Sequence, residues 1–142
     1  MTPCAASRAD ATRLHFHVSL NEEHVFLDIA LAPDAQIGLG ERVHHYSLLT
    51  LARLRLADAQ RGLDASSQGW VDVGCLSQML GLDASHLNIQ IHRARHQFAQ
   101  AMPPQAQAAA IVERRRGEIR FGTLAFRITR GGNVEGEFPL PA

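Results

Sequence analysis

The sequence predicts an α+β fold with an N-terminal antiparallel sheet, three helices and a C-terminal β-hairpin. Three observations lead to this class. Apolar and polar residues alternate strictly over residues 14–20 and 25–31, as in strands that bury one face. Between residues 41 and 101 the apolar period becomes helical. Later in the chain IVERRR and IRF flank Gly117-Glu118, which predicts a hairpin with arginine along its first strand.

The 142 residues fit one domain, which we place at residues 14–130. Residues 1–13 are expected to form a flexible N-terminal tail. The glycine- and proline-rich residues 131–142 are expected to form a second, C-terminal one. No apolar run approaches the roughly 20 residues that span a bilayer, and the first residues lack the apolar region of a secretory signal. A cytoplasmic protein without membrane contact is therefore predicted, with Cys4 and Cys75 as free thiols.

The N-terminal sheet is expected to begin with a hairpin. Strands 14–20 and 25–31 are joined by Asn21-Glu22-Glu23-His24, and Pro33-Asp34 marks the next turn. Residues 36–39 could add a third short strand.

The first helix is predicted from about Glu41 to Arg61, and Gly62 stands where a C-terminal cap belongs. Its apolar stripe recurs at helical spacing through His45, Leu48, Leu49, Ala52, Leu56 and Ala59. A short apolar piece, Trp70-Val71, follows a polar loop. Trp70 is interpreted as a core anchor beside a short strand.

Two short helices joined by a tight turn are predicted next. Asp72 can cap the first of them, which ends at Gly81. Asp83 or Ser85 can cap the second, which runs to about Ala101 before Pro103-Pro104 stops it. The first of the two is expected to bury Leu76, Met79 and Leu80, with Cys75 as a packed thiol on its apolar side.

Residues 105–110 could form a loop or a helical turn, and LAFRI after the hairpin makes a closing strand. Two short helices followed by a hairpin form the element order of a winged helix-turn-helix. The sequence therefore predicts this architecture for residues 14–130.

The predicted helix at residues 84–101 has an unusual outer face. One stripe is apolar and should pack inward through Leu87, Ile91, Ala94 and Phe98. The residues left outside include no acid, although a solvated helix face usually mixes both signs of charge. Donors and neutral polar groups suit phosphates and base edges, which are rich in acceptors.

Charge is divided unevenly along a chain whose net charge is zero. Up to residue 83 there are six arginines and ten acidic residues, whereas residues 84–130 hold eight arginines and only two glutamates. The chain has no lysine, which a GC-rich genome would explain. Codon usage does not explain where the arginines lie. Their excess over acidic residues in residues 84–130 indicates an anionic partner.

The stretch HLNIQIHRARHQF, residues 86–98, resembles the recognition helix of OmpR/PhoB-type winged-helix domains, which often reads T-V-D-V-H-I-x-R-L-R-x-K-L. Segments 41–52, 70–80 and 111–121 resemble the first helix, the strand with the second helix, and the wing of that family. The resemblance covers about residues 14–128. The wing lacks one glycine of the usual R-G-x-G-Y-R. The turn at residues 81–84, between the second and third helices, is also short. In the family a longer loop at this place contacts protein partners, so the short turn puts such contacts in doubt here.

The resemblance implies a regulator of transcription that binds double-stranded DNA, with helix 84–101 in the major groove and hairpin 111–121 near the adjacent minor groove. The predicted DNA-binding residues are Ser85, His86, Asn88, Gln90, His92, Arg93, Arg95 and His96 on the helix and Arg114 and Arg116 on the hairpin. The chain is also similar to winged-helix segments beside forkhead-associated domains in bacterial proteins. That similarity implies a signalling context, with a signalling or transcription protein as a further partner.

Other classes have less support. His92 and His96 have zinc spacing on a helix, but Arg93 between them repels a metal, so neither a metal nor a cofactor is expected. No nucleophile-elbow, P-loop or paired-carboxylate motif predicts an enzyme. RNA binding would need exposed aromatic residues, and nearly all of the aromatics fall at core positions. The neutral net charge keeps open a protein-interaction module that retains the fold without binding DNA, and a homodimer also remains open.

Overall fold

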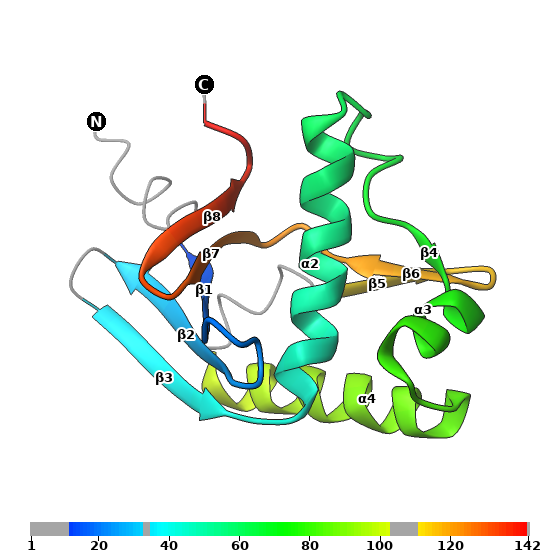
Figure 1. Cartoon of the computed structure of the whole chain (residues 1–142), viewed down its shortest axis with the longest axis horizontal. Helices are drawn as coiled ribbons and strands as arrows, with labels where there is room; N and C mark the ends of the chain where they lie inside the picture. The colour runs from blue at the N-terminus through cyan, green and yellow to red at the C-terminus, as the bar shows by residue number, and fades with distance from the viewer. Residues whose placement is uncertain (1–11, 33–34, 103–110, 142) are drawn as a thin grey trace.

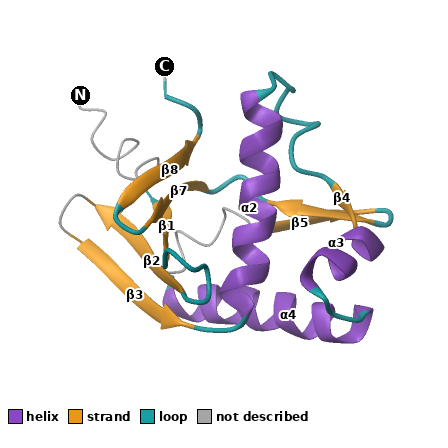
Figure 2. Ribbon diagram, in the orientation of Figure 1, coloured by secondary structure: helices purple, strands orange, loops and turns teal. Residues whose placement is uncertain are grey.

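A computed structural model of the chain describes residues 12–32, 35–102 and 111–141 (Figure 1). Predictions for the tail residues 1–11 with Cys4, the turn at Pro33-Asp34, and the segment 103–110 lie outside the described residues. The α+β class with three helices is confirmed, and the strands are divided between two sheets (Figure 2).

The larger sheet is mixed, which corrects the prediction of an antiparallel N-terminal sheet. β1 pairs antiparallel with β2, and β2 pairs with β3 as expected, but β7 lies parallel to β1 on its other side. Leu14 and Phe16 of β1 are buried on the same face as Phe126 and Ile128 of β7, and this shared apolar face holds the distant strand in place. The sheet order is β3 (Ala35–Glu41), β2 (Val25–Ala32), β1 (Arg13–Val18), β7 (Ala125–Arg130) and β8 (Asn133–Phe138).

The presence of β8 corrects a second prediction, because residues 131–142 were expected to be flexible. β8 forms a hairpin with β7 and lies against α2 (His44–Gln60). Gly136 permits this close approach, since a Cβ atom there would overlap the side chain of Leu56. Glu135 of β8 accepts two hydrogen bonds from Arg53 of α2, which anchors a strand that has little apolar surface of its own.

The smaller sheet has the order β4-β6-β5 and lies beside the three helices. β5 (Val112–Arg115) and β6 (Glu118–Phe121) form the hairpin that the sequence predicts. β4 (Val71–Asp72) precedes α3 (Val73–Leu80) and pairs with β6. The last helix is α4 (Ala84–Ala101).

Capping residues set the start of α3 and the turn between α3 and α4. Asp72 accepts a hydrogen bond from the Cys75 backbone N–H at the start of α3, and Asp83 does the same for His86 at the start of α4. Gly81 ends α3 with φ of 68°, in the left-handed region that glycine tolerates.

One continuous core joins the larger sheet to the helices, and Leu76 of α3 is fully buried in it. Two predictions for α3 are wrong, because Cys75 is exposed and Met79 is 55% exposed. A helix of eight residues that packs through one short stripe leaves these positions outside the core.

Candidate nucleic-acid interface

The predicted buried stripe of α4 is confirmed. Leu87, Ile91, Ala94 and Phe98 are all buried, so the opposite side of the helix faces solvent. Ile89 is exposed on that open side. Seven of the eight predicted contact residues on α4 are exposed, namely Ser85, His86, Asn88, His92, Arg93, Arg95 and His96.

Gln90 is the exception among these eight. It is half-buried, and its Oε1 accepts a 2.7 Å hydrogen bond from the Ser47 hydroxyl of α2. On the helix Gln90 lies three residues after Leu87, on the flank of the apolar stripe that meets α2. Its side chain therefore serves the contact between the two helices, and the structure does not bring it onto the open face.

The β5–β6 hairpin reaches α4 through Arg114. Its Nη2 donates to Oδ1 of Asn88 over 3.4 Å, which places the two predicted basic segments side by side. In the antiparallel register Arg114 stands opposite Ile119, whereas Arg115 stands opposite Glu118 on the other face. The register therefore places Arg114 and Arg115 on opposite faces of the hairpin. Arg116 lies in the exposed turn of the hairpin.

Four arginines of α4 and the hairpin differ from most of the others in what they contact. Arg53, for example, donates to Glu22 and Glu135 over 2.7 to 2.9 Å. Among the described residues, no carboxylate pairs with Arg93, Arg95, Arg114 or Arg116. The remaining arginine ion pairs join Arg13 and Arg127 to Glu137, Arg61 to Asp58, Arg115 to Glu118, Arg120 to Glu113 and Arg130 to Glu22.

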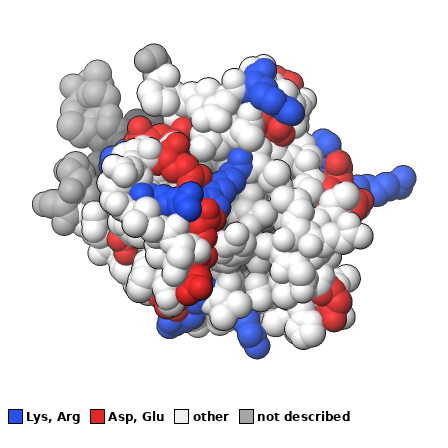
Figure 3. Space-filling model, viewed as in Figure 1, with Lys and Arg blue, Asp and Glu red and all other residues white. Residues whose placement is uncertain are grey.

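The space-filling view agrees with this division. In Figure 3 basic side chains project at the lower edge, along α4, and at the right edge beyond the hairpin. Acidic side chains are most numerous over the sheet, where basic side chains lie among them, and others lie beside the hairpin at the right edge and at the lower right. On α4 and the hairpin, the arginines that have no carboxylate partner within the described part of the chain form a surface able to neutralise phosphates.

One carboxylate does lie at the end of this surface. Asp83 caps α4, and its Oδ1 is 3.0 Å from Nδ1 of His86. The hydrogen bond from the His86 backbone N–H holds the pKa of Asp83 below its usual range, so the carboxylate is charged near neutral pH. A protonated His86 would be partly neutralised by it, which favours the arginines over His86 as anion contacts.

Sequence reasoning missed Arg42, which is exposed and precedes α2. Its guanidinium donates to the backbone oxygen of Glu41, and no carboxylate among the described residues pairs with it. Burial is the main reason why the pKa of His44 is lowered, and the positive charges of Arg42 and Arg93 lower it further. Arg42 therefore extends the basic surface beside α4. Its acidic sequence neighbour, Glu41, gives no signal of this position.

A buried polar network joins the C-terminal part of α4 to α2 and β3. His44 and His45 of α2 both approach Oε1 of Gln97, with Nε2–O distances of 2.8 and 2.9 Å. Gln97 donates through Nε2 to the Leu39 carbonyl of β3, and Nδ1 of His45 faces the Val25 carbonyl. A neutral His45 carries one N–H, so it donates to only one of its two oxygen neighbours at a time.

This network predicts loss of stability in mild acid. Burial lowers the pKa of His44 and of His45, so below pH 6.5 the unfolded chain binds protons that the folded chain does not. The free energy of unfolding should therefore fall by at most about 1 kcal/mol for each histidine between pH 6.5 and 5.5. Urea unfolding at both pH values measures it. The double change His44→Asn and His45→Asn should flatten this dependence, and an undiminished fall in that variant would contradict the assignment.

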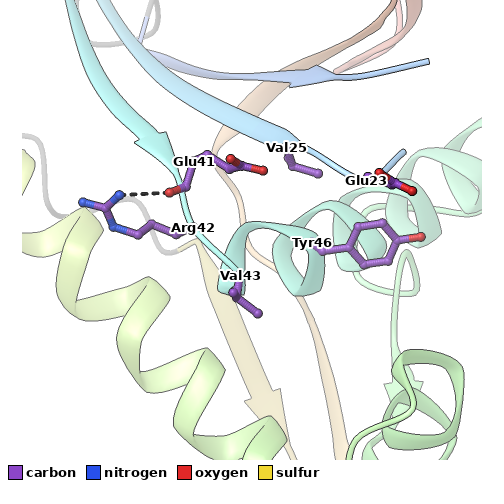
Figure 4. Close-up of a pocket in the computed structure, with 6 residues that line it drawn as sticks. All are labelled: Glu23, Val25, Glu41, Arg42, Val43 and Tyr46. Atoms are coloured by element: carbon purple, nitrogen blue, oxygen red, sulfur yellow. Dashed lines mark hydrogen bonds between the residues drawn. The ribbon is translucent and has the colours of Figure 1, made fainter. Parts of the chain in front are cut away.

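A pocket of about 520 Å³ opens beside Arg42, where β2 and β3 meet the start of α2 (Figure 4). Val25 is buried in its wall, while Val43 and Tyr46 expose apolar surface and Glu23 and Glu41 add carboxylates. The hydrogen bond from the Arg42 guanidinium to the backbone oxygen of Glu41 is drawn at the edge of the pocket.

Within the described ranges, no group of three or more His, Cys, Asp or Glu side chains could hold a metal ion. His92 and His96 stack with ring centroids 6.2 Å apart. None of the described helices is both long and apolar enough to cross a membrane.

Comparison of the chain with protein-family models, with curated proteins and with solved structures finds no match.

Proposed function

We propose that residues 44–121 form a winged helix-turn-helix. The support is topological. α2, β4, α3, α4 and the β5–β6 hairpin follow one another in that order, and β4 pairs with the second strand of the hairpin. The short capped turn between α3 and α4 fits the helix-turn-helix, and α4 takes the place of its recognition helix.

The proposed function is binding of double-stranded DNA, as a transcription regulator in the cytoplasm. The observation that carries it is the contact between Asn88 and Arg114, which joins α4 to the β5–β6 hairpin. Each of the two elements carries two arginines without a carboxylate partner among the described residues, namely Arg93 and Arg95 on α4 and Arg114 and Arg116 on the hairpin. Arg93, Arg95, Arg114 and Arg116 would contact phosphates. Base edges would be contacted from the exposed helix positions Ser85, His86, Asn88 and His92.

A salt titration tests this proposal. Fluorescence anisotropy of a labelled random-sequence duplex, titrated with the protein at several salt concentrations, gives the slope of log K against log salt. Four phosphate contacts predict a slope of about −3.6. Failure of the folded protein to bind duplex at low salt would contradict the proposal.

A second candidate is a protein-interaction module in bacterial signalling. The pocket beside Val43 and Tyr46 favours it, because it combines exposed apolar side chains with the exposed carboxylate of Glu23. A fold by itself does not fix a function, so the two candidates are separated by binding data. Salt-independent binding of a protein partner, without duplex binding, would favour this second candidate.

A further inference from the structure

The face of the small sheet that points away from Arg114 is built around Trp70, which directly precedes β4. The guanidinium carbons of Arg115 and Arg120 lie 4.1 and 4.5 Å from the centroid of the Trp70 rings. Both distances are within the range of cation–π attraction. The sequence predicts Trp70 as a core anchor, but it is half-buried and contacts the arginines of the hairpin.

The same arginines close the hairpin on this face. Arg115 donates to Glu118 over 2.7 Å and Arg120 donates to Glu113 over 2.8 Å, and both pairs stand directly opposite each other in the register. Arg120 also donates to the carbonyls of Ala65 and Gln68. The hairpin is thus tied to the loop that precedes β4.

Trp70 is fixed in turn by that loop. Its Nε1 donates to the Ser66 carbonyl over 2.9 Å. Gly69 brings the loop against α2, with φ of 78° and with Arg55 so close that a Cβ atom would lie 2.8 Å from the Arg55 Cβ. The loop, Trp70 and the hairpin therefore form one connected unit.

We propose that Trp70, by stacking on Arg115 and Arg120, is a positioning residue that sets the angle of the β5–β6 hairpin and so brings Arg114 and Arg116 onto the surface formed by α4. Trp70 itself touches no DNA. This role rests on the proposed DNA binding. It also separates the three consecutive arginines by task, since Arg115 holds the hairpin while its neighbours face the ligand.

Two substitutions separate the aromatic face from apolar bulk. Trp70→Phe keeps a ring for both guanidinium groups but loses the N–H bond to Ser66, whereas Trp70→Leu keeps only apolar volume. Each is made in the full chain, alone and together with Arg114→Ala and Arg116→Ala. The readouts are the salt slope for a random-sequence duplex and, without DNA, amide hydrogen exchange of residues 112–121.

Trp70→Leu is expected to make the salt slope shallower by about 1 to 2 and to weaken binding by about tenfold at low salt, as the loss of two phosphate contacts would. It should add nothing further to the Arg114→Ala and Arg116→Ala variant. Trp70→Phe should stay near the unaltered protein. Exchange in residues 112–121 should rise in the leucine variant while exchange in α4 and the larger sheet stays constant.

An unchanged slope for Trp70→Leu, or equal losses for leucine and phenylalanine, would overturn the positioning role. Exchange that rises over the whole chain would also overturn it, because that pattern indicates general destabilisation. If the unaltered protein binds no duplex, the proposed function fails instead, and the exchange measurement still reports whether Trp70 holds the hairpin.

Discussion

Replacing Arg93, Arg95, Arg114 and Arg116 with alanine is expected to weaken duplex binding by at least about a hundredfold at low salt and to remove about 3 to 4 from the magnitude of the salt slope. The reason is that each neutralised phosphate releases counterions, and these arginines have no carboxylate partner among the described residues. Anisotropy titrations of the variant and the unaltered protein measure both quantities.

A matched control removes the same charge elsewhere. Arg13, Arg61, Arg127 and Arg130 lie away from α4 and the hairpin, and each forms an ion pair in the structure. Alanine at these four positions should change the salt slope by less than about 1. Equal losses in the two quadruple variants would show that only total charge matters, and this would contradict a localised interface.

Arg55→Met is expected to lower the free energy of unfolding by about 3 kcal/mol, the largest stability effect that we predict for one side chain. Arg55 is buried in α2 and donates to the carbonyls of Phe121 and Gly122 over 3.0 and 2.6 Å. Its guanidinium carbon also lies 4.7 Å from the centroid of the Phe138 ring. Methionine fills similar volume but leaves both carbonyls buried without this donor.

The position of Arg55 explains why this effect should be large. Phe121 and Gly122 are the point where the chain leaves β6 and continues toward β7, so Arg55 secures the connection between the two sheets. Arg61→Met is the control, since Arg61 lies just after α2 and is mostly exposed. It should change the free energy of unfolding by less than about 0.5 kcal/mol. Denaturant unfolding of both variants measures the difference, and equal stabilities would contradict the role given to Arg55.

The features that the sequence predicts correctly are local ones. The spacing of Leu87, Ile91, Ala94 and Phe98 is enough to orient α4, because helix periodicity depends on nearby residues only. Gly81 and Asp83 define the turn between the last two helices for the same reason, and Asp72 defines the start of α3.

The features that the sequence misses depend on contacts between distant segments. The parallel pairing of β1 with β7 joins strands more than 100 residues apart. β8 is held in place by the close approach of Gly136 to Leu56 and by an ion pair to Arg53. Gln90 looks like any exposed helix residue until its hydroxyl partner on α2 is known. Arg42 joins the basic surface through the arrangement of α2 and α4, which no local pattern reveals.

The measurement that tests the central claim most directly is an amide NMR titration of the isotopically labelled protein with a short duplex. Binding through α4 and the hairpin predicts chemical-shift changes concentrated at residues 84–96 and 112–118, with small changes in β2, β3 and β8. Changes centred on the larger sheet or on the pocket beside Tyr46, or no changes at all, would contradict it.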